Sequence, residues 1–174
     1  MGRRESYMRP HVSMLLLVGC IVLSMPDFPS AQISSLDDQV RIEDVSVVMS
    51  NMGPVIFLKA HKRVVQIFVD PTVAGSIDGA LRGMKSPRPL SHDLMHTILR
   101  EFGGTVTEVR IKLKGHIYYG ELVVAVNGDH KVFDSRSSDA IALAIHFEAP
   151  IFIERAVFDQ ADSVTNNAND AQFL

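Results

Sequence analysis

Two short stretches of the chain each place an arginine shortly before a serine, an aspartate and an apolar run. The arginine is Arg88 in RPLSHDLMHTIL and Arg136 in DSRSSDAIALAI. Each apolar run predicts a helix, and a helix N-terminus offers free amides and partial positive charge. A guanidinium beside such an end makes a compact site for a phosphate oxygen. The two stretches therefore indicate phosphate recognition.

Carboxylates at the same places would repel a phosphate unless a divalent cation lay between them. Asp93, Asp134 and Asp139 supply the hard oxygen ligands that Mg²⁺ binds. His92 adds a group that transfers protons near neutral pH. Together these residue types indicate metal-assisted cleavage of a phosphate ester.

A purely structural role explains the same residues equally well. Ser91 and Ser138 would accept hydrogen bonds from the free amides at the starts of their helices. Asp93 and Asp139 would lie in first turns, where the helix dipole favours negative charge. An arginine that pairs with such an aspartate completes this interpretation. The spacing alone does not decide between helix caps and a phosphate site.

The segments around these stretches predict the elements that must position them. Alternating or β-branched apolar residues predict strands, and apolar residues that recur every three or four positions predict helices. Hairpins of strands interrupted by helices predict an α+β fold with a mixed, largely antiparallel sheet and three to four helices. We expect strands at residues 40–49, 55–59, 64–69, 117–126, 130–134 and 150–154 and from Thr105, and helices after Asp70, from Ser91 and at residues 138–147. One face of the helix from Ser91 carries Leu94, Ile98, Leu99 and Phe102.

The composition limits the classes of protein to which the chain can belong. A chain of 174 residues, 47% hydrophobic and 21% charged, can bury one sizeable core and form one domain. The net charge is −3, and no run of Lys or Arg marks a basic arm for nucleic acid, so phosphate binding must be local. The Gly-rich phosphate loop, the Gly-x-Ser-x-Gly elbow and the His-Glu-x-x-His motif are absent from the sequence.

The N-terminal segment predicts export. An arginine-rich start, MGRRESYMRPH, precedes the apolar run VSMLLLVGCIVLSM, which is the pattern of a signal peptide over residues 1–31. The apolar run is short for a bilayer span of about 20 residues, and Pro26 and Pro29 follow it, so a permanent anchor is the weaker interpretation. We therefore expect an extracytoplasmic protein, either periplasmic, secreted or lipid-anchored.

Two processing sites compete within this segment. LVGC, from Leu17 to Cys20, resembles a bacterial lipobox, whose cysteine would carry a lipid and attach the protein to a membrane. PSA instead allows cleavage after Ala31, and Cys20 is then an ordinary apolar residue. Because Cys20 is the only cysteine, the mature domain has no intramolecular disulfide and no cysteine-based site.

Five segments of the chain, in this order and at these spacings, resemble the bifunctional nuclease domain, a family found in bacteria and plants. They are DPTVAGSIDGAL, RPLSHDLMHTIL, YYGELVV, DSRSSDAIALAI and APIFI, and the resemblance covers residues 40–161. It implies a single wedge-like domain that self-associates, a groove as active site, and nuclease activity on DNA and RNA. Its motifs point to Arg88, His92, Asp93, Asp134, Arg136, Ser138 and Asp139 as site residues.

The sequence departs from the family pattern at two positions. Ser137 stands where the family usually has a proline. Val73 stands where a glutamate commonly opens the helix after Asp70-Pro71. If that glutamate binds metal or acts as a base, this chain is a weak or inactive member.

The resulting hypothesis is an exported, metal-assisted nuclease that acts on DNA and RNA and forms homo-oligomers. The alternative is a catalytically weak or inactive binding or assembly module with the same fold. The expected organisation is a signal peptide at residues 1–31, a linker at 32–39, the nuclease-like domain at 40–161 and a flexible tail at 162–174. In the nuclease hypothesis, Arg88, Arg136 and Ser138 bind phosphate, His92, Asp93 and Asp139 are catalytic, and Asp93, Asp134 and Asp139 hold the Mg²⁺ ion.

Overall fold

The computed structural model describes residues 38–163. These residues form four helices and nine strands. The strands are β1 (Gln39–Arg41), β2 (Asp44–Ser50), β3 (Gly53–Ala60), β4 (Arg63–Phe68), β5 (Gly104–Lys114), β6 (Ile117–Val126), β7 (Asp129–Arg136), β8 (Ile151–Glu154) and β9 (Asp162–Ser163). The helices are α2 (Pro71–Leu81), α3 (Ser91–Glu101), α4 (Ser137–Phe147) and α5 (Arg155–Asp159).

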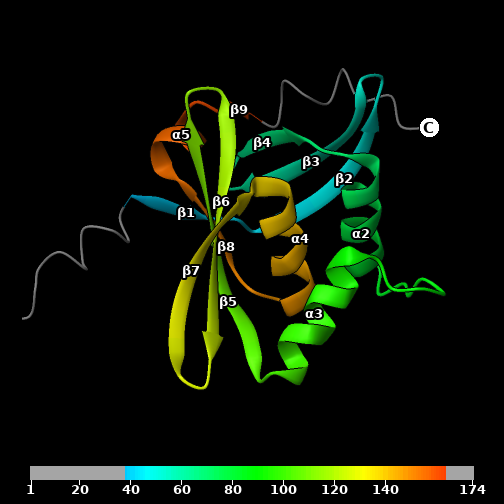
Figure 1. Ribbon diagram of the computed structural model, residues 1–174. Coiled ribbons are helices and arrows are strands. Elements are labelled where there is room, and N and C mark those ends of the chain that lie inside the picture. Colours follow the sequence, from blue (N-terminus) through cyan, green and yellow to red (C-terminus); the bar gives the residue numbers. More distant parts are fainter. Residues whose placement is uncertain (1–37, 164–174) are drawn as a thin grey trace, which may run out of the picture.

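The strands divide between two sheets. One has the strand order β1-β8-β5-β6-β7 and the other the order β2-β3-β4-β9. All neighbouring strands are antiparallel except β5 and β8, which are parallel. The two sheets diverge, and α2, α3 and α4 fill the angle between them, so the domain has a wedge-like outline (Figure 1). The predicted α+β fold with a largely antiparallel sheet is confirmed, with two sheets in place of one.

The first predicted strand, residues 40–49, is in fact two strands in different sheets. The chain changes sheet at Ile42 and Glu43. The amide of Ile42 donates to the carbonyl of Ile151 at 2.9 Å, beside β8, and the amide of Glu43 donates to Lys59 at 2.8 Å, in β3. The apolar pattern runs through the switch because both halves are partly covered by the same core. Periodicity therefore could not reveal the break.

Helix α4 forms the centre of the core. It contacts α2 and α3 on its sides and β5 and β6 beneath (Figure 1). Ala140, Ile141, Ala142 and Ala144 are fully buried. A helix that is apolar on all sides is normally enclosed by protein, so the run SSDAIALAI specifies its position in the interior.

Helix α3 is oriented differently from a usual amphipathic helix. Leu94, Ile98 and Phe102 are 50%, 47% and 77% exposed, whereas Leu99 packs against the core and His92 is buried. Most of its apolar face therefore points to solvent. The inward orientation of His92 has a polar cause, because this side chain hydrogen-bonds to α2 and α4, as described below.

The predicted terminal segments lie largely outside the described residues. This applies to the signal peptide at residues 1–31 and to most of the linker at 32–39. Asp162–Ser163, at the start of the predicted tail, pair with β4 as strand β9. None of the helices within residues 38–163 is long and apolar enough to cross a membrane.

A glycine in β6 determines how closely α4 approaches the sheet. A Cβ atom on Gly120 would lie 2.5 Å from Cβ of Ala140 and 3.1 Å from the carbonyl oxygen of Arg136. It would also lie 3.0 Å from Oγ of Ser135, which can rotate away, whereas Ala140 and the Arg136 carbonyl are held by the start of α4 and cannot. Gly120 and Ala140 together set the position of the first turn of α4.

Replacing Gly120 by alanine should therefore destabilise the fold. We expect Gly120→Ala to lower the free energy of unfolding by about 1–3 kcal/mol, the usual cost of overpacking. Gly75→Ala is the matched control, since a Cβ there meets no atom within 4 Å. It should stabilise α2 by about 0.5–1 kcal/mol, because alanine favours the helix over glycine. Denaturant unfolding measures both, and a neutral Gly120→Ala would contradict the packing argument.

Candidate functional site

The two arginine-bearing stretches meet at Asp139, in the first turn of α4. The guanidinium of Arg136 donates two hydrogen bonds to this carboxylate, from Nε to Oδ2 at 2.7 Å and from Nη2 to Oδ1 at 3.0 Å. Nε2 of His92, in the first turn of α3, lies 3.3 Å from Oδ1. The side chain of His92 is 6% exposed, that of Asp139 26% and that of Arg136 69%. One carboxylate thus joins a buried imidazole to an exposed guanidinium.

A serine of α2 extends this cluster into the interior. Oγ of Ser76 lies 3.1 Å from Nδ1 of His92 and 3.3 Å from Nε2 of His146, near the end of α4. Ser76 is buried, and the two imidazole rings face each other with their centroids 6.4 Å apart. Buried polar groups are costly unless hydrogen-bonded. The Ser76 hydroxyl satisfies a nitrogen of each ring, and three helices are thereby linked by polar contacts.

Asp93 lies at the far end of the same network. Its Oδ1 is 3.8 Å from Nδ1 of His146, and its Oδ2 accepts a hydrogen bond from the amide of Leu90 at 2.8 Å. The second contact caps α3, because it satisfies an amide at the helix start. The six polar residues that connect in order across the three helices are Arg136, Asp139, His92, Ser76, His146 and Asp93, and we call them the polar chain.

The capping interpretation is wrong for the serines and holds for both aspartates, which lie in the first turns of α3 and α4. Leu90 is the N-cap of α3 and Arg136 that of α4, and neither Ser91 nor Ser138 makes a side-chain capping bond. Asp93 does cap α3, through the amide of Leu90. The carboxylate of Asp139 pairs with Arg136, as that interpretation expects, and it also contacts His92, which the interpretation does not include.

The charges around Asp139 favour its ionised form. Burial raises the pKa of this carboxyl, but the hydrogen bonds and positive charge of Arg136, followed by the hydrogen bond of His92, together bring the pKa below its usual value. Asp139 in turn raises the pKa of Arg136. Asp70, the N-cap of α2, also interacts electrostatically with Arg136. Asp139 is therefore an anion at neutral pH and can only accept hydrogen bonds.

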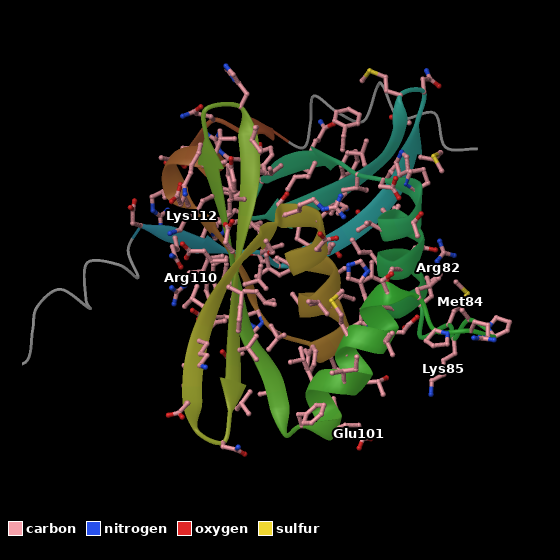
Figure 2. All side chains as sticks on the ribbon, in the orientation of Figure 1. Arg82, Met84, Lys85, Glu101, Arg110 and Lys112 are labelled. Atoms are coloured by element: carbon pink, nitrogen blue, oxygen red, sulfur yellow. The ribbon has the colours of Figure 1, made fainter. Side chains whose placement is uncertain are left out.

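A groove opens at the other end of the polar chain. Its volume is about 540 Å³, and it lies between the end of α2, the segment 82–90, α3 and the end of α4. Figure 2 shows Met84 and Lys85, which line it, on the segment that leaves the body of the domain beside α2 and α3. The polar side chains along its walls are Lys85, Ser86, Asp93, His96, Thr97, His146 and Glu148.

Burial affects the imidazole at this groove. Burial lowers the pKa of His146, the carboxylate of Asp93 opposes this effect, and the neighbouring His92 and His96 lower the pKa further. The rings of His96 and His146 have centroids 6.0 Å apart. His146 is therefore mainly neutral at neutral pH, which leaves it able to accept a proton.

Three of the predicted site residues lie apart from the polar chain. Asp134 is exposed on β7, and its neighbour Ser135 faces α4. Because successive side chains of a strand point to opposite faces of the sheet, Asp134 lies on the face away from α4. Ser138 is buried and not open to a phosphate. Arg88 is exposed on the segment 82–90 and forms no hydrogen bond or ion pair within residues 38–163.

The predicted metal ligands are not gathered at one place. Asp93 and Asp139 lie at different parts of the polar chain, and Asp134 is on the other face of the sheet. Within residues 38–163, no group of three or more His, Cys, Asp or Glu side chains is arranged to hold a metal ion. These side chains alone therefore do not fit a metal centre.

Sequence reasoning missed two central members of the polar chain, Ser76 and His146. Ser76 is a polar residue in the apolar part of α2, between Val73 and Ile77, and such a residue needs a buried partner. His146 lies seven residues after Asp139, which places both on one face of α4. Both signals are present in the sequence, but each becomes informative only when the neighbouring helices are known.

The lowered pKa of His146 predicts how stability depends on pH. Because the folded state binds this proton more weakly than the unfolded state does, stability is fully present above about pH 6.5 and is lost as the pH falls through the folded pKa. We expect the Tm to fall between about pH 7.5 and pH 5.5 and His146→Gln to reduce this dependence. The lowered pKa of Asp139 affects the pH dependence of stability only below about pH 4. An equal pH dependence in both proteins would contradict the assignment.

Comparison with known proteins identifies the family. The model of the bifunctional nuclease domain matches residues 55–166, more than half of the chain. Proteins from two strains of Mycobacterium tuberculosis, both described as uncharacterised, are each 31% identical to it over 137 residues, which is 77% of this chain and 82% of the relative. The matched residues include all six members of the polar chain. The chain belongs to the bifunctional nuclease domain family.

Proposed function

We propose that the protein is a nuclease that hydrolyses phosphodiester bonds of DNA and RNA at the exposed end of the polar chain. The observation that carries the proposal is the shared carboxylate of Asp139, which binds an exposed guanidinium on one side and a buried imidazole on the other. Family membership supports a nuclease but assigns no catalytic residue.

The roles of these residues follow from their chemistry. The guanidinium of Arg136 uses Nε and Nη2 on Asp139, and its remaining N–H groups are free to bind phosphate oxygens and stabilise the charge that develops on them. Asp139 orients the imidazole of His92 through its contact with Nε2. His92 serves as the group that transfers a proton. Arg88 is exposed and forms no hydrogen bond or ion pair within residues 38–163, so it is available as a second phosphate contact.

The charged outer face of the five-stranded sheet offers less for a phosphate. Figure 2 shows Arg110 and Lys112 there, on the side away from α3. Arg110 is paired with Glu108, and Nζ of Lys112 lies 2.6 Å from Glu121. All three cations are paired with carboxylates, but the side chain of Arg136 is 69% exposed, compared with 37% for Arg110 and 29% for Lys112. We therefore place the substrate at Arg136.

A Mg²⁺ requirement remains part of the proposal. Mg²⁺ is often held by one or two carboxylates together with substrate phosphates, so it would bind with the substrate and not before it. Val73, at the position of the usual glutamate, is buried in the core. That position therefore supplies no carboxylate to a metal ion. Adding a chelator to the assay tests whether activity depends on Mg²⁺.

The experiment is a nuclease assay on plasmid DNA and RNA, with and without a chelator. We expect Asp139→Asn to reduce the rate about a hundredfold, the scale of removing one catalytic electrostatic group. Asp78→Asn is the matched control, since it breaks only a surface ion pair with Arg82. Circular dichroism and the Tm establish that each variant is folded. An equal rate in wild type and Asp139→Asn would contradict the proposed site.

A further variant distinguishes the proposed site at Asp139 from the predicted metal site formed by Asp93, Asp134 and Asp139. Asp134→Asn alters only a carboxylate on the opposite sheet face, so the site at Asp139 predicts an unchanged rate. A loss of activity as large as that of Asp139→Asn would instead support a site that includes Asp134.

We also propose that residues 1–31 direct export and that Cys20 carries a lipid if the lipobox-like LVGC is used. The arginine-rich start and the apolar run support this proposal. Fractionation of expressing cells tests it, and full-length protein confined to the cytosol would contradict it.

The exposed face of α3 favours a second function, as an assembly module. Leu94, Met95, Ile98 and Phe102 fall within one third of the helix circumference, and all are exposed. A continuous apolar stripe of this kind marks an interaction surface in most soluble proteins. We propose that it contacts a second copy of the chain, which requires no catalytic group.

A charge placed on this stripe tests the assembly. We expect the wild type to be a homo-oligomer, and both Ile98→Glu and Phe102→Glu to shift it towards the monomer with little change in Tm, because both side chains are already exposed. Ile117→Glu is the control, on an isoleucine at the start of β6 that is more exposed than Ile98. Light scattering after size-exclusion chromatography gives the molar mass. A monomeric wild type would contradict the proposal.

A further inference from the structure

Strand β7 leaves an open edge on the five-stranded sheet. It is the last strand in the order β1-β8-β5-β6-β7, so only β6 pairs with it among the described residues. Figure 1 shows it along the left margin of the domain. With eight residues it is the longest edge strand of the two sheets, and residues 129–134 are all exposed. An edge of this length, with unpaired N–H and C=O groups, is a template for a further strand.

The turn before β7 determines which of its backbone groups are free. Residues 127 and 128 form a two-residue loop between β6 and β7, and both have a positive φ, 53° and 90°. In a tight hairpin turn of this kind the closing pair, which includes Asp129, exchanges both N–H···O bonds. Hydrogen-bonded pairs alternate along an antiparallel ladder, so His130, Val132 and Asp134 direct their N–H and C=O groups away from β6. These groups can bind a neighbouring strand.

We propose that β7 pairs antiparallel with β7 of a second copy of the chain, with Val132 opposite the partner subunit's Val132. A two-fold axis perpendicular to the sheet relates the two copies and keeps each side chain on its own face. The register is therefore centred on one residue and not between two. Pairing at this edge joins the two five-stranded sheets into one continuous sheet.

The charges of β7 select this register. With Val132 at the centre, His130 lies opposite the partner's Asp134, whose carboxylate accepts from the imidazole N–H. Lys131 lies opposite the partner's Phe133, and the apolar stem of the lysine covers the ring. A centre at Lys131 or Asp134 would place two like charges directly opposite each other, which is destabilising. A centre at Phe133 would place Val132 opposite the partner's Asp134 and separate His130 from that carboxylate.

The same register covers the exposed apolar side chains of the edge. Val132 and Phe133 are 56% and 48% exposed in the single chain. The two Val132 side chains meet on one face of the joined sheet. The two Phe133 rings are diagonal neighbours on the other face, within reach of each other. A charged residue or a proline commonly protects the middle of an edge strand, whereas the middle of β7 is apolar.

The pairing extends to the candidate site. Strand β7 ends at Arg136, which in this register lies opposite the partner's Gly128, at the tip of a hairpin. The second copy therefore lies beside the guanidinium that we propose to bind phosphate. Because Gly128 and Arg136 are eight residues apart, the two Arg136 positions are separated by roughly 27 Å along the strands. Pairing thus places two copies of the site on the same side of one sheet.

Cysteine cross-linking tests the register. All variants of the full chain carry Cys20→Ser, so that the introduced thiol is the only one. Val132→Cys should form an intermolecular disulfide under mild oxidation, because directly opposite residues have Cα atoms about 5.5 Å apart. Asp134→Cys is the matched control, since the partner's thiol is displaced by four residues, roughly 13 Å, which a disulfide cannot span. No cross-link in Val132→Cys, or equal cross-linking of both variants, would overturn the proposal.

A proline variant tests the hydrogen bonds. The N–H of Val132 points away from β6, so Val132→Pro removes no hydrogen bond within one chain but blocks pairing with a second. We expect its molar mass, measured by light scattering, to fall to about half that of the wild type, with an unchanged circular dichroism spectrum. Val132→Thr keeps the N–H and the β-branched shape and should retain the wild-type molar mass. A Val132→Pro protein with the wild-type molar mass would overturn the proposal.

The β7 contact is separate from the contact proposed for the apolar stripe of α3. Helix α3 packs against β5, and β6 lies between β5 and β7. The Val132→Cys disulfide should therefore form equally well in an Ile98→Glu background. Loss of the disulfide there would show that only the α3 contact brings the copies together, which would overturn β7 as an interface. The disulfide is measured without substrate, so the result does not depend on nuclease activity.

Discussion

The close contact between Ala140 and Gly120 is the constraint on which the rest of the structure depends. It fixes the depth of α4 on the five-stranded sheet, and α2 and α3 then pack against the sides of α4. The first turn of α4 also carries Asp139, and Arg136 immediately precedes the helix. Packing at one point therefore determines both the layer arrangement and the place where the guanidinium, the carboxylate and the imidazole meet. Any side chain larger than hydrogen at Gly120 would disturb both.

Much of the fold could be predicted from local patterns. The hairpin of β3 and β4, the start of α2 at Asp70 and the buried helix after Arg136 all follow from apolar periodicity and from Asp-Pro at a helix start. The switch between sheets at Ile42 could not be predicted, because the apolar pattern is the same on both sides of it. The orientation of α3 was also unpredictable. Its apolar residues dominate the pattern, yet the hydrogen bonds of His92 decide which side faces inward.

The candidate site was predictable to a smaller extent. The sequence indicates His92, Arg136 and Asp139 because each is a chemically capable residue at a helix start. Asp134 has the same chemistry, and only the alternation of β7 shows that it faces the other way. Ser76 could not be selected, since a single serine in a helix has many explanations until two imidazoles are found on either side of it. Local sequence identifies reactive groups, whereas tertiary packing decides which of them touch.

The sheet change at Ile42 also determines the order in which the protein can be completed during synthesis. Strand β1 pairs only with β8, more than a hundred residues later, whereas β2, β3 and β4 pair with their immediate neighbours along the chain. During synthesis, β2, β3 and β4 can therefore pair early. Strand β1 can pair only after β8, which ends at Glu154, has left the ribosome. Contacts of such long sequence separation form slowly. A truncated chain that ends before Ile151 leaves β1 without a partner strand and leaves one edge of β5 unpaired.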